Sequence, residues 1–464
     1  MITLENRFFP LRSTVCFFVE GGIIFFSVVL SYLILLKGGG DVPIGFRDAI
    51  LRGIAIAFIC QGCMYMLDLY DLEVHLTSGQ ISFSIIYSAG FVCVGIGIFS
   101  YLYPEFGLPG KFYFFSIFFT IIFLFLWRYF FDLYLTRFGR KENLLIVGSE
   151  NITAEIEKEI LVREKLGFRL VGYINSGPVA GATNPLKAPC LGNYEDIVRV
   201  VRDLGVKKII VALTERRGGY PVKSLLTLRT SGVRIIEWQG FLESLSGRIP
   251  IDNLSPSHFI YNDGFRKSRS ILFLRRCISA LLAAILLLLF LPVMILVAVA
   301  IKLDSIGPVF YTQLRVGQGD RIFRIFKFRS MRVNAEKEGE AQWAVENDPR
   351  VTRVGSFIRA ARLDELPQLI NVLRGDLDIV GPRPERPEFV ELFNEKIPYY
   401  TLRHTVKPGL TGWAQVMFHY SGTDEESRKK LQYDLFYIKN MSLKFDLLIL
   451  FKTVKIVLLG RGAR

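Results

Sequence analysis

The sequence is poor in the residue types that most often hold transition metals or form disulfides. Its 464 residues include only 4 histidines, which are scattered without ligand spacing. Five of the 6 cysteines lie in apolar runs, where a thiol behaves as a small hydrophobic side chain. Cys60 and Cys63 form a C-x-x-C inside a hydrophobic segment, and Cys190 stands alone in a polar region. These scarcities argue against a transition-metal site, a redox centre and a disulfide framework.

Charged residues are also scarce, at 22% of the chain, whereas hydrophobic residues make up 51%. With a mean hydropathy of +0.35, this composition excludes a disordered chain and predicts an integral membrane protein. Acids are outnumbered, since 57 Lys and Arg against 43 Asp and Glu give a net charge of +14. A basic membrane protein most simply meets anionic headgroups or phosphorylated substrates. Nucleic acid is the rival partner, and the apolar half of the chain argues against it.

Four apolar stretches near the N-terminus are each long enough to cross a bilayer, which needs about 20 residues. They lie at 15–36, 49–67, 81–103 and 112–135, so we predict a membrane helical bundle of four spans over residues 1–139. Glu20 and Arg128 lie within these runs, and a charge inside a membrane is a functional candidate by default. The loop charges do not orient the bundle.

Residues 140–262 alternate strand-like and helical segments, which predicts a soluble α/β domain with a Rossmann-like parallel sheet. A dinucleotide site would need G-x-G-x-x-G after the first strand. Here Gly148 is followed by Glu150 and Thr153 at the other two positions. A carboxylate there repels a pyrophosphate, so we expect no NAD and favour an oligomerisation or regulatory module.

Residues 263–464 are predicted to form a mostly α, membrane-associated catalytic domain. Its apolar run at 277–301 is long enough to span but contains Pro292, which removes a helix hydrogen bond and forces a kink. Basic residues flank both ends, which indicates that both ends face the cytosol. We therefore favour a proline-broken re-entrant helix over an ordinary kinked span. The tail at 443–459 reads equally as an interfacial amphipathic helix or a core helix.

Four motifs in this last domain carry chemistry. The first interleaves glycines with cations, which suits a loop around phosphates; it contains Gln313, Arg315, Lys327 and Arg329. The second holds Arg359 and the adjacent acids Asp364 and Glu365, which on a helix point about 100° apart. One acid can be a nucleophile while the other helps to hold Mg²⁺, which takes carboxylate and phosphate oxygens together.

The third motif places Arg383 between Pro382 and Pro384, which preorganises a phosphate-binding fork. The fourth is K-P-G-L-T-G-W-A-Q, from Lys407 to Gln415. The strings K-F-R-S-M, L-D-E-L-P-Q, V-G-P-R-P and K-P-G-L-T-G-W-A-Q resemble the bacterial sugar transferases, also called polyprenyl-phosphate hexose-1-phosphate transferases or large monotopic phosphoglycosyl transferases. The resemblance covers residues 270–460, and the exosortase-associated exopolysaccharide subgroup is a finer match.

The resemblance implies a role for each matching residue. Asp364 would attack the β-phosphate of a UDP-sugar, release UMP and pass the phosphosugar to a polyprenyl (undecaprenyl) phosphate. Asp364 and Glu365 would hold Mg²⁺, with Mn²⁺ as the alternative. The expected substrate-binding residues are Lys327, Arg329, Arg359, Arg383, Gln313 and Arg315. Two departures from the family pattern are Asp376-Leu-Asp378, where G-D-M-S is frequent, and Arg362, where serine is common.

Such an enzyme would start exopolysaccharide, capsule or O-antigen synthesis at the bacterial inner membrane, as a multi-pass protein whose catalytic domain faces the cytoplasm. The expected partners are a UDP-sugar, polyprenyl phosphate, membrane lipids and a second copy in a homodimer. One alternative is a non-catalytic scaffold or regulator of polysaccharide assembly. Another is a metal-dependent glycosyltransferase that uses Asp376 and Asp378. A nucleotide-sugar dehydratase or epimerase would need an intact glycine fingerprint and a Tyr-x-x-x-Lys pair. In this sequence the first is broken and the second is absent.

Overall fold

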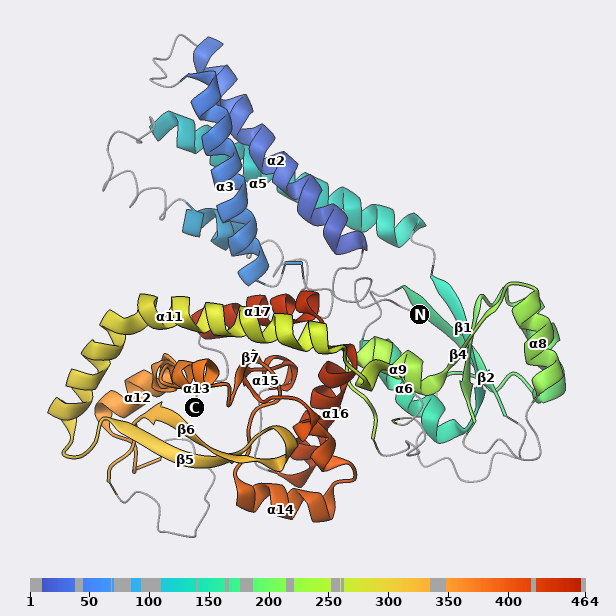
Figure 1. Ribbon diagram of the computed structural model, residues 1–464. Helices are drawn as coiled ribbons and strands as arrows, with labels where there is room; N and C mark the ends of the chain where they lie inside the picture. Colours follow the sequence, from blue (N-terminus) through green and yellow to red (C-terminus); the bar gives the residue numbers. More distant parts are fainter. Residues whose placement is uncertain are drawn as a thin grey trace. The chain divides into compact units, whose positions relative to one another are not determined.

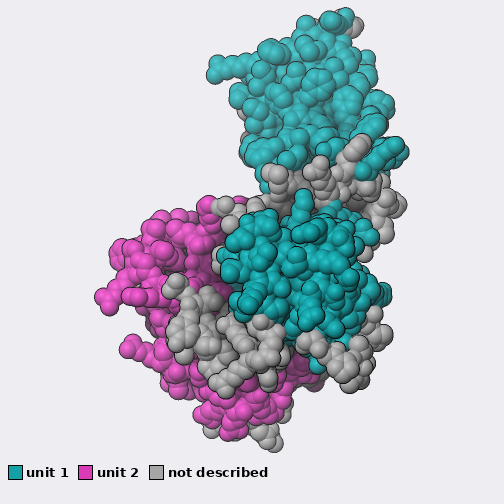
Figure 2. Space-filling model, turned by 90° about the vertical axis from the view of Figure 1, so that its right-hand side faces the viewer, with its two compact units in different colours: residues 1–246 teal, residues 247–464 magenta. Residues whose placement is uncertain are grey.

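The computed structural model describes residues 11–37, 45–67, 69–70, 85–92, 110–138, 141–162, 167–175, 187–213, 221–251, 259, 263–333, 348–418 and 423–459. The chain divides into two compact units, Met1–Ser246 and Gly247–Arg464, which Figure 2 colours separately. The second unit begins before the predicted boundary at 262/263, because residues 247–251 bond to it. Gly247 O accepts from Trp413 Nε1 at 2.9 Å, and Ile249 N donates to Gln432 O at 3.0 Å.

Among the described residues of the first unit, three long helices belong to the membrane bundle: α2 (Leu11–Lys37), α3 (Phe46–Met66) and α5 (Gly110–Phe138). Each contains a stretch long and apolar enough to cross a membrane, which confirms the predicted spans at 15–36, 49–67 and 112–135. Of the predicted span at 81–103, residues 85–92 are helical and the rest lie outside the described residues. Helix α2 packs against both α3 and α5 (Figure 1).

The two charges predicted inside the bundle pair with each other. Arg128 Nε and Nη2 donate to the two carboxylate oxygens of Glu20 at 2.8 and 3.0 Å, and the Glu20 side chain is fully buried. Arg128 Nη1 also donates to Leu69 O at 3.3 Å. The pair therefore joins α2 to α5 with matched charges, as buried ionic groups in apolar surroundings require.

The rest of the first unit is an open sheet of four parallel strands in the order β2-β1-β3-β4. The strands are β1 (Glu142–Gly148), β2 (Phe168–Ile174), β3 (Lys208–Ala212) and β4 (Arg234–Glu237). Helices α6 (Glu150–Val162) and α9 (Trp238–Ser246) cover one face, and α7 (Ile197–Asp203) and α8 (Val222–Thr230) cover the other. Alternating strand residues feed the two cores, Leu144 and Ile146 on one side and Leu145 and Val147 on the other. The predicted parallel α/β sheet is confirmed.

The second unit is organised around one long helix, α11 (Arg269–Asp304), of 36 residues. At 1.5 Å per residue its path is about 54 Å, well beyond the roughly 30 Å of a bilayer core. Helical structure continues through Pro292, and the ribbon bends in its second half (Figure 1). Much of the surface of α11 is apolar and exposed, as at Leu288, Leu296 and Leu303.

Several of the elements that follow α11 pack against it. In the described part of this unit, the strands form two small sheets: an antiparallel hairpin of β5 (Phe310–Val316) and β6 (Ile322–Phe328), and a parallel pair of β7 (Asp378–Val380) and β8 (Gly409–Thr411). Its helices are α12 (Arg353–Ala360), α13 (Gln368–Arg374), α14 (Pro387–Lys396), α15 (Trp413–Met417), α16 (Asp424–Asn440) and α17 (Leu443–Leu458). Helices α12 and α13 and strand β7 all contact α11, which ties this part of the unit to the long apolar helix.

Helix α17 confirms the helix predicted at 443–459 and is apolar on two sides. Phe445, Leu448 and Ile449 are buried, whereas Leu447 and Phe451 are more than half exposed. The helix therefore packs on the core with one side and leaves an apolar strip on the other.

A buried ion pair joins α17 to the start of α11, and breaking it is expected to destabilise the second unit. Arg275 Nε donates to Asp446 Oδ2 at 2.6 Å, and both side chains are largely buried. Asp446→Ala removes the carboxylate paired with a buried guanidinium, which costs about 3–5 kcal/mol of unfolding free energy. Urea unfolding in detergent micelles checks this. The matched control is Lys429→Ala, at an exposed pair with Glu425, where a change under about 1 kcal/mol is expected. Equal shifts for the two variants would contradict the prediction.

Candidate active site

The adjacent acids of the second motif lie on a tight reversal between two helices. Helix α12 ends at Ala360, Arg362 adopts a left-handed conformation with φ of 55°, and a single 3-10 turn, Leu363–Glu365, follows before α13. The left-handed residue stops the α-helical hydrogen-bond pattern. The prediction that Asp364 and Glu365 lie on an α-helix together with Arg359 is therefore wrong. The reversal instead carries both acids on a turn.

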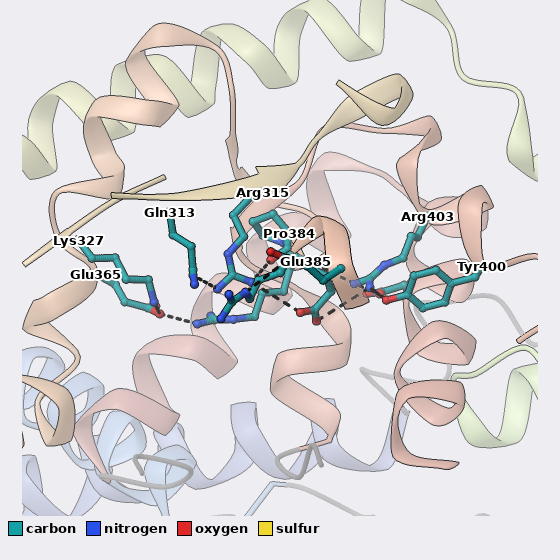
Figure 3. A network of polar contacts seen from close by, with 12 residues as sticks. Gln313, Arg315, Lys327, Glu365, Pro384, Glu385, Tyr400 and Arg403 are labelled. Carbon is teal, nitrogen blue, oxygen red and sulfur yellow. Dashed lines mark hydrogen bonds and ion pairs between the residues drawn. The ribbon is translucent and has the colours of Figure 1, made fainter. Parts of the chain in front are cut away.

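Glu365 accepts from two cations that come from different motifs (Figure 3). Lys327 Nζ, on β6, donates to Glu365 Oε1 at 3.0 Å, and Arg383 Nη2, after β7, donates to the same oxygen. Burial would raise the pKa of Glu365, but the charges of Arg383 and Lys327 outweigh it and hold that pKa well below its usual range. Glu365 is thus a permanent anion that fixes the two cations beside its neighbour.

Asp364 is in the opposite electrostatic situation. Burial, and then the adjacent Glu365 charge, raise the pKa of the Asp364 carboxyl above its usual range. The positive charges of Lys327, Arg359 and Arg383 act in the other direction and favour the ionised form. Among the described residues, none donates a hydrogen bond to this carboxylate. It is therefore a half-buried, poorly solvated anion near three cations, which is the condition expected of a nucleophile for a phosphoryl group.

The hairpin presents the amide and cations of the first motif on one face. Tyr311, Gln313 and Arg315 are spaced two residues apart on β5, so their side chains lie on the same face of the hairpin. Lys327 lies directly opposite Tyr311 in the antiparallel register and therefore shares that face. Arg315 Nη2 donates to Gln313 Oε1 at 2.7 Å, and its Nη1 donates to Pro384 O at 3.1 Å. The structure therefore joins the first motif to the segment that carries Arg383 (Figure 3).

Two of the predicted substrate-binding cations have different surroundings. Arg359, on α12, lies near enough to Asp364 to favour its ionised form. Arg329 is buried and is not brought into the cluster: its Nη1 donates to Ile306 O at 3.1 Å and its Nη2 to Ser305 O at 2.8 Å. It therefore holds the connection from α11 to β5, which leaves its predicted contact with substrate without support in the geometry.

Other polar residues extend this network, and the sequence motifs do not include them. Glu385 lies near Arg315 at 3.7 Å and near Arg403 at 4.0 Å. Arg403 donates to Tyr400 Oη at 2.6 Å and pairs with Asp434 at 2.8 Å. Glu385 directly follows P-R-P and could have been found from that position. Arg403 and Asp434 come from distant segments with no motif to mark them.

The alternative metal site at Asp376 and Asp378 gains no support. Asp378 is buried in β7, 3.7 Å from Arg276, and burial raises its pKa. Asp376 Oδ2 accepts from Asn371 Nδ2 at 3.1 Å. Each acid is thus part of a local structural contact. Across the described part of the chain, no group of three His, Cys, Asp or Glu side chains is placed to hold a metal ion.

A magnesium ion would therefore need to share ligands between protein and substrate. Both hydrogen bonds of the described residues to Glu365 end on Oε1, and the Asp364 carboxylate accepts none. Two carboxylates with free oxygens, completed by phosphate and water, are a usual ligand set for Mg²⁺. The residues at the turn fit such an ion.

The sequence is similar to two protein families and to several named enzymes. A family model described as bacterial sugar transferase matches residues 270–460, and one described as CoA-binding domain matches residues 66–236. A UDP-N-acetylgalactosamine-undecaprenyl-phosphate N-acetylgalactosaminephosphotransferase of Aeromonas hydrophila is 49% identical over 48% of this chain and 52% of its own length. A UDP-glucose:undecaprenyl-phosphate glucose-1-phosphate transferase of Escherichia coli (strain K12) is 37% identical over 62% of each chain.

A third relative, from Caulobacter vibrioides and also named UDP-glucose:undecaprenyl-phosphate glucose-1-phosphate transferase, is 44% identical over 39% of this chain and 68% of its own length. The chain spans 52% of the Aeromonas protein and 62% of the Escherichia protein. Neither family model distinguishes the exosortase-associated subgroup.

The described residues of the α/β sheet do not fit a coenzyme A diphosphate at the usual place, the first helix N-terminus after β1. Helix α6 begins at Glu150, whose carboxylate accepts from Tyr173 Oη at 3.2 Å. Ser149 N donates to Ala212 O at 2.9 Å, and a Cβ on Gly148 would lie 2.3 Å from the same oxygen. The ends of β1 and β3 are thus closed together and a carboxylate occupies the anion position.

Proposed function

The chain belongs to the bacterial sugar transferase family, and from this premise we propose that it transfers a sugar 1-phosphate from a UDP-sugar to undecaprenyl phosphate and releases UMP. The observation that carries the proposal is Asp364, a carboxylate with a raised pKa that accepts no hydrogen bond from a described residue, beside Lys327, Arg359 and Arg383. The names of the three relatives reported above each include a UDP-sugar and undecaprenyl phosphate.

In the proposed reaction, an Asp364 oxygen attacks the β-phosphorus of the donor. The bond between this phosphorus and the bridging oxygen breaks, and UMP leaves with that oxygen. The phosphosugar remains on Asp364 as an acyl phosphate. A phosphate oxygen of the lipid carrier then attacks the same phosphorus, which restores the carboxylate and yields the lipid diphosphate sugar. This is a two-step covalent exchange.

The cations explain how an anion can attack another anion. Lys327 and Arg383 are fixed by Glu365, so their charge is in place before the donor binds. Preorganised charge of this kind stabilises negative charge that develops on the transferring phosphoryl group. Asp364 and Glu365 would hold Mg²⁺, or Mn²⁺ in its place, and the ion would supply further charge neutralisation at the diphosphate.

The donor to test first is UDP-N-acetylgalactosamine. The Aeromonas relative that carries this sugar in its name is 49% identical, whereas the Escherichia and Caulobacter relatives named for glucose are 37% and 44% identical. All three alignments cover limited parts of the chain, so UDP-glucose and UDP-galactose are the comparison donors.

The membrane placement follows from the same chemistry. The bend in α11 supports a re-entrant helix that enters and leaves one leaflet, and the exposed apolar strip of α17 supports contact with lipid. UDP-sugars are cytosolic, so the site would face the cytoplasm at the inner membrane. The α/β sheet would serve a homodimer contact or regulation of the enzyme.

Nucleotide release tests the proposal. Purified protein in nanodiscs receives undecaprenyl phosphate, Mg²⁺ and each UDP-sugar in turn, and the released nucleotide is quantified. UMP with one donor, lost on chelation, is the expected result. UDP would instead indicate a glycosyltransferase, and no nucleotide from folded protein would favour the scaffold.

The raised pKa of Asp364 gives a pH prediction. Asp364 is inactive when protonated, so kcat/KM should fall on the acid side at a pH above the usual range of an aspartate, about 4. Arg359→Gln removes a charge that favours the carboxylate, so it should move this acid limb to still higher pH. Initial rates of UMP release between pH 4 and 8 measure the acid limb of the wild type and that of Arg359→Gln. A limb in the ordinary aspartate range that Arg359→Gln leaves in place would contradict the assignment.

A further inference from the structure

The segment that carries Arg383, residues 380–385, is held almost entirely through its carbonyl groups. It contains two prolines, which have no N–H to donate. Val380 O accepts from Arg275 Nη2 at 3.1 Å, Arg383 O from Arg403 Nη2 at 2.9 Å, and Pro384 O from Arg315 Nη1 at 3.1 Å. The backbone after β7 keeps two bonds to β8, from Gly381 N to Thr411 O at 2.8 Å and from Gly409 N to Pro382 O at 2.9 Å. Three guanidinium groups from three different elements add to this support by binding carbonyls of the segment.

Arg403 is the one of these three that bonds to the backbone of Arg383 itself. Its side chain is 4% exposed, and its counterion is Asp434 on α16, whose side chain is 2% exposed. Its Nη1 is bonded to Tyr400 Oη, and its Nη2 is shared between Arg383 O and Asp434. A guanidinium committed in this way acts on a substrate only through the residue it holds.

A chain of contacts therefore connects α16 to the turn at Leu363–Glu365. Asp434 orients Arg403, Arg403 fixes the Arg383 carbonyl, and the Arg383 guanidinium donates to Glu365, next to Asp364. Figure 3 shows Arg403 and Tyr400 at one end of the network and Lys327 and Glu365 at the other. The distance between the ends means that a change at Arg403 reaches the turn by moving the Arg383 segment.

We propose that Arg403 is a positioning residue that sets where the Arg383 guanidinium lies beside Asp364 and Glu365. The inference rests on the proposed function for its kinetic consequence, but the position of the segment can be measured without turnover. A loop residue needs such support because a displacement of about 1 Å in a catalytic group can cost about 100-fold in rate.

The kinetic test is a double-mutant cycle of Arg403→Lys and Arg383→Lys. Arg403→Lys keeps a positive charge against Asp434 but loses the planar fork that reaches Arg383 O and Asp434 together. We expect kcat/KM for UMP release to fall about 10–100-fold in this variant. The same change made in the Arg383→Lys background should have little further effect, because the group that it positions is already altered. An equal fall in both backgrounds would mean that Arg403 only supports the fold, and would overturn the inference.

Hydrogen–deuterium exchange tests the positioning role of Arg403 without catalytic turnover. In Arg403→Lys, the amides of Gly381 and Gly409, which donate to Thr411 O and Pro382 O, should exchange faster, while those of β3 in the α/β sheet stay as in the wild type. Unchanged exchange at Gly381 and Gly409, or faster exchange throughout the protein, would overturn the positioning role. A wild-type protein that releases no UMP would sink the proposed function, and the exchange experiment would still decide the role of Arg403. Lys396→Met, at an exposed pair with Asp424 outside the network, is the control in both experiments.

Discussion

Asp364→Asn is expected to reduce UMP release by about four orders of magnitude or more, the usual cost of removing a covalent nucleophile. Asparagine has nearly the same shape and leaves Lys327, Glu365 and Arg383 with their own contacts. The loss would therefore come from the missing anion and not from a collapsed site. Initial rates with the preferred donor measure it, and the melting temperature shows that the variant is folded.

A trapping experiment separates a nucleophile from a metal ligand. A donor labelled in its β-phosphate, given without lipid acceptor, should label the wild-type protein and leave Asp364→Asn unlabelled. Asp424→Asn, at an exposed acid of α16, is the matched control and should label normally. Labelling of Asp364→Asn at the wild-type level would move the covalent step to another residue.

Glu365→Gln is expected to reduce kcat by about 100- to 1,000-fold, the range seen when a preorganised electrostatic group is removed. The carboxylate of Glu365 holds both Lys327 and Arg383, so an amide leaves two cations without their common anion. The variant also loses the adjacent negative charge that raises the pKa of Asp364, so its acid limb should move to lower pH. Steady-state rates against pH give both quantities from one series.

The two parts of that result can be told apart. Glu365→Asp keeps the negative charge but shortens the reach toward Lys327 and Arg383. Its acid limb should therefore stay near that of the wild type, while most of the rate is lost. If Glu365→Gln kept a rate within threefold of the wild type, the ion-paired arrangement would not be the one used in catalysis.

The motif strings that resemble the family already contained both residues that donate to Glu365. Lys327 and Arg383 both belong to strings recognisable in the sequence, and the alternation of β5 explains why Gln313 and Arg315 share a face. The membrane spans and the parallel sheet followed from apolar length and from alternating patterns, because both signals are properties of continuous segments.

The remainder depended on contacts that no local pattern encodes. Arg362 adopts a left-handed conformation, but an arginine, unlike glycine or asparagine, does not signal a turn in the sequence. The chain reversal at Asp364 could therefore not be predicted from the sequence. Arg329 lies two residues after Lys327 but, beyond the end of β6, turns to the carbonyls of Ser305 and Ile306. Arg403 reaches Arg383 from 20 residues away, and only the tertiary fold brings them together.

The apolar surface of α11 has a kinetic consequence for the proposed enzyme. A protein held in a bilayer by this surface meets its lipid acceptor by diffusion in two dimensions. The effective acceptor concentration is then its mole fraction among the surrounding lipids. Adding inert lipid at a constant total amount of carrier should slow the second half-reaction by surface dilution, while the first, which draws a water-soluble donor from solution, keeps its rate.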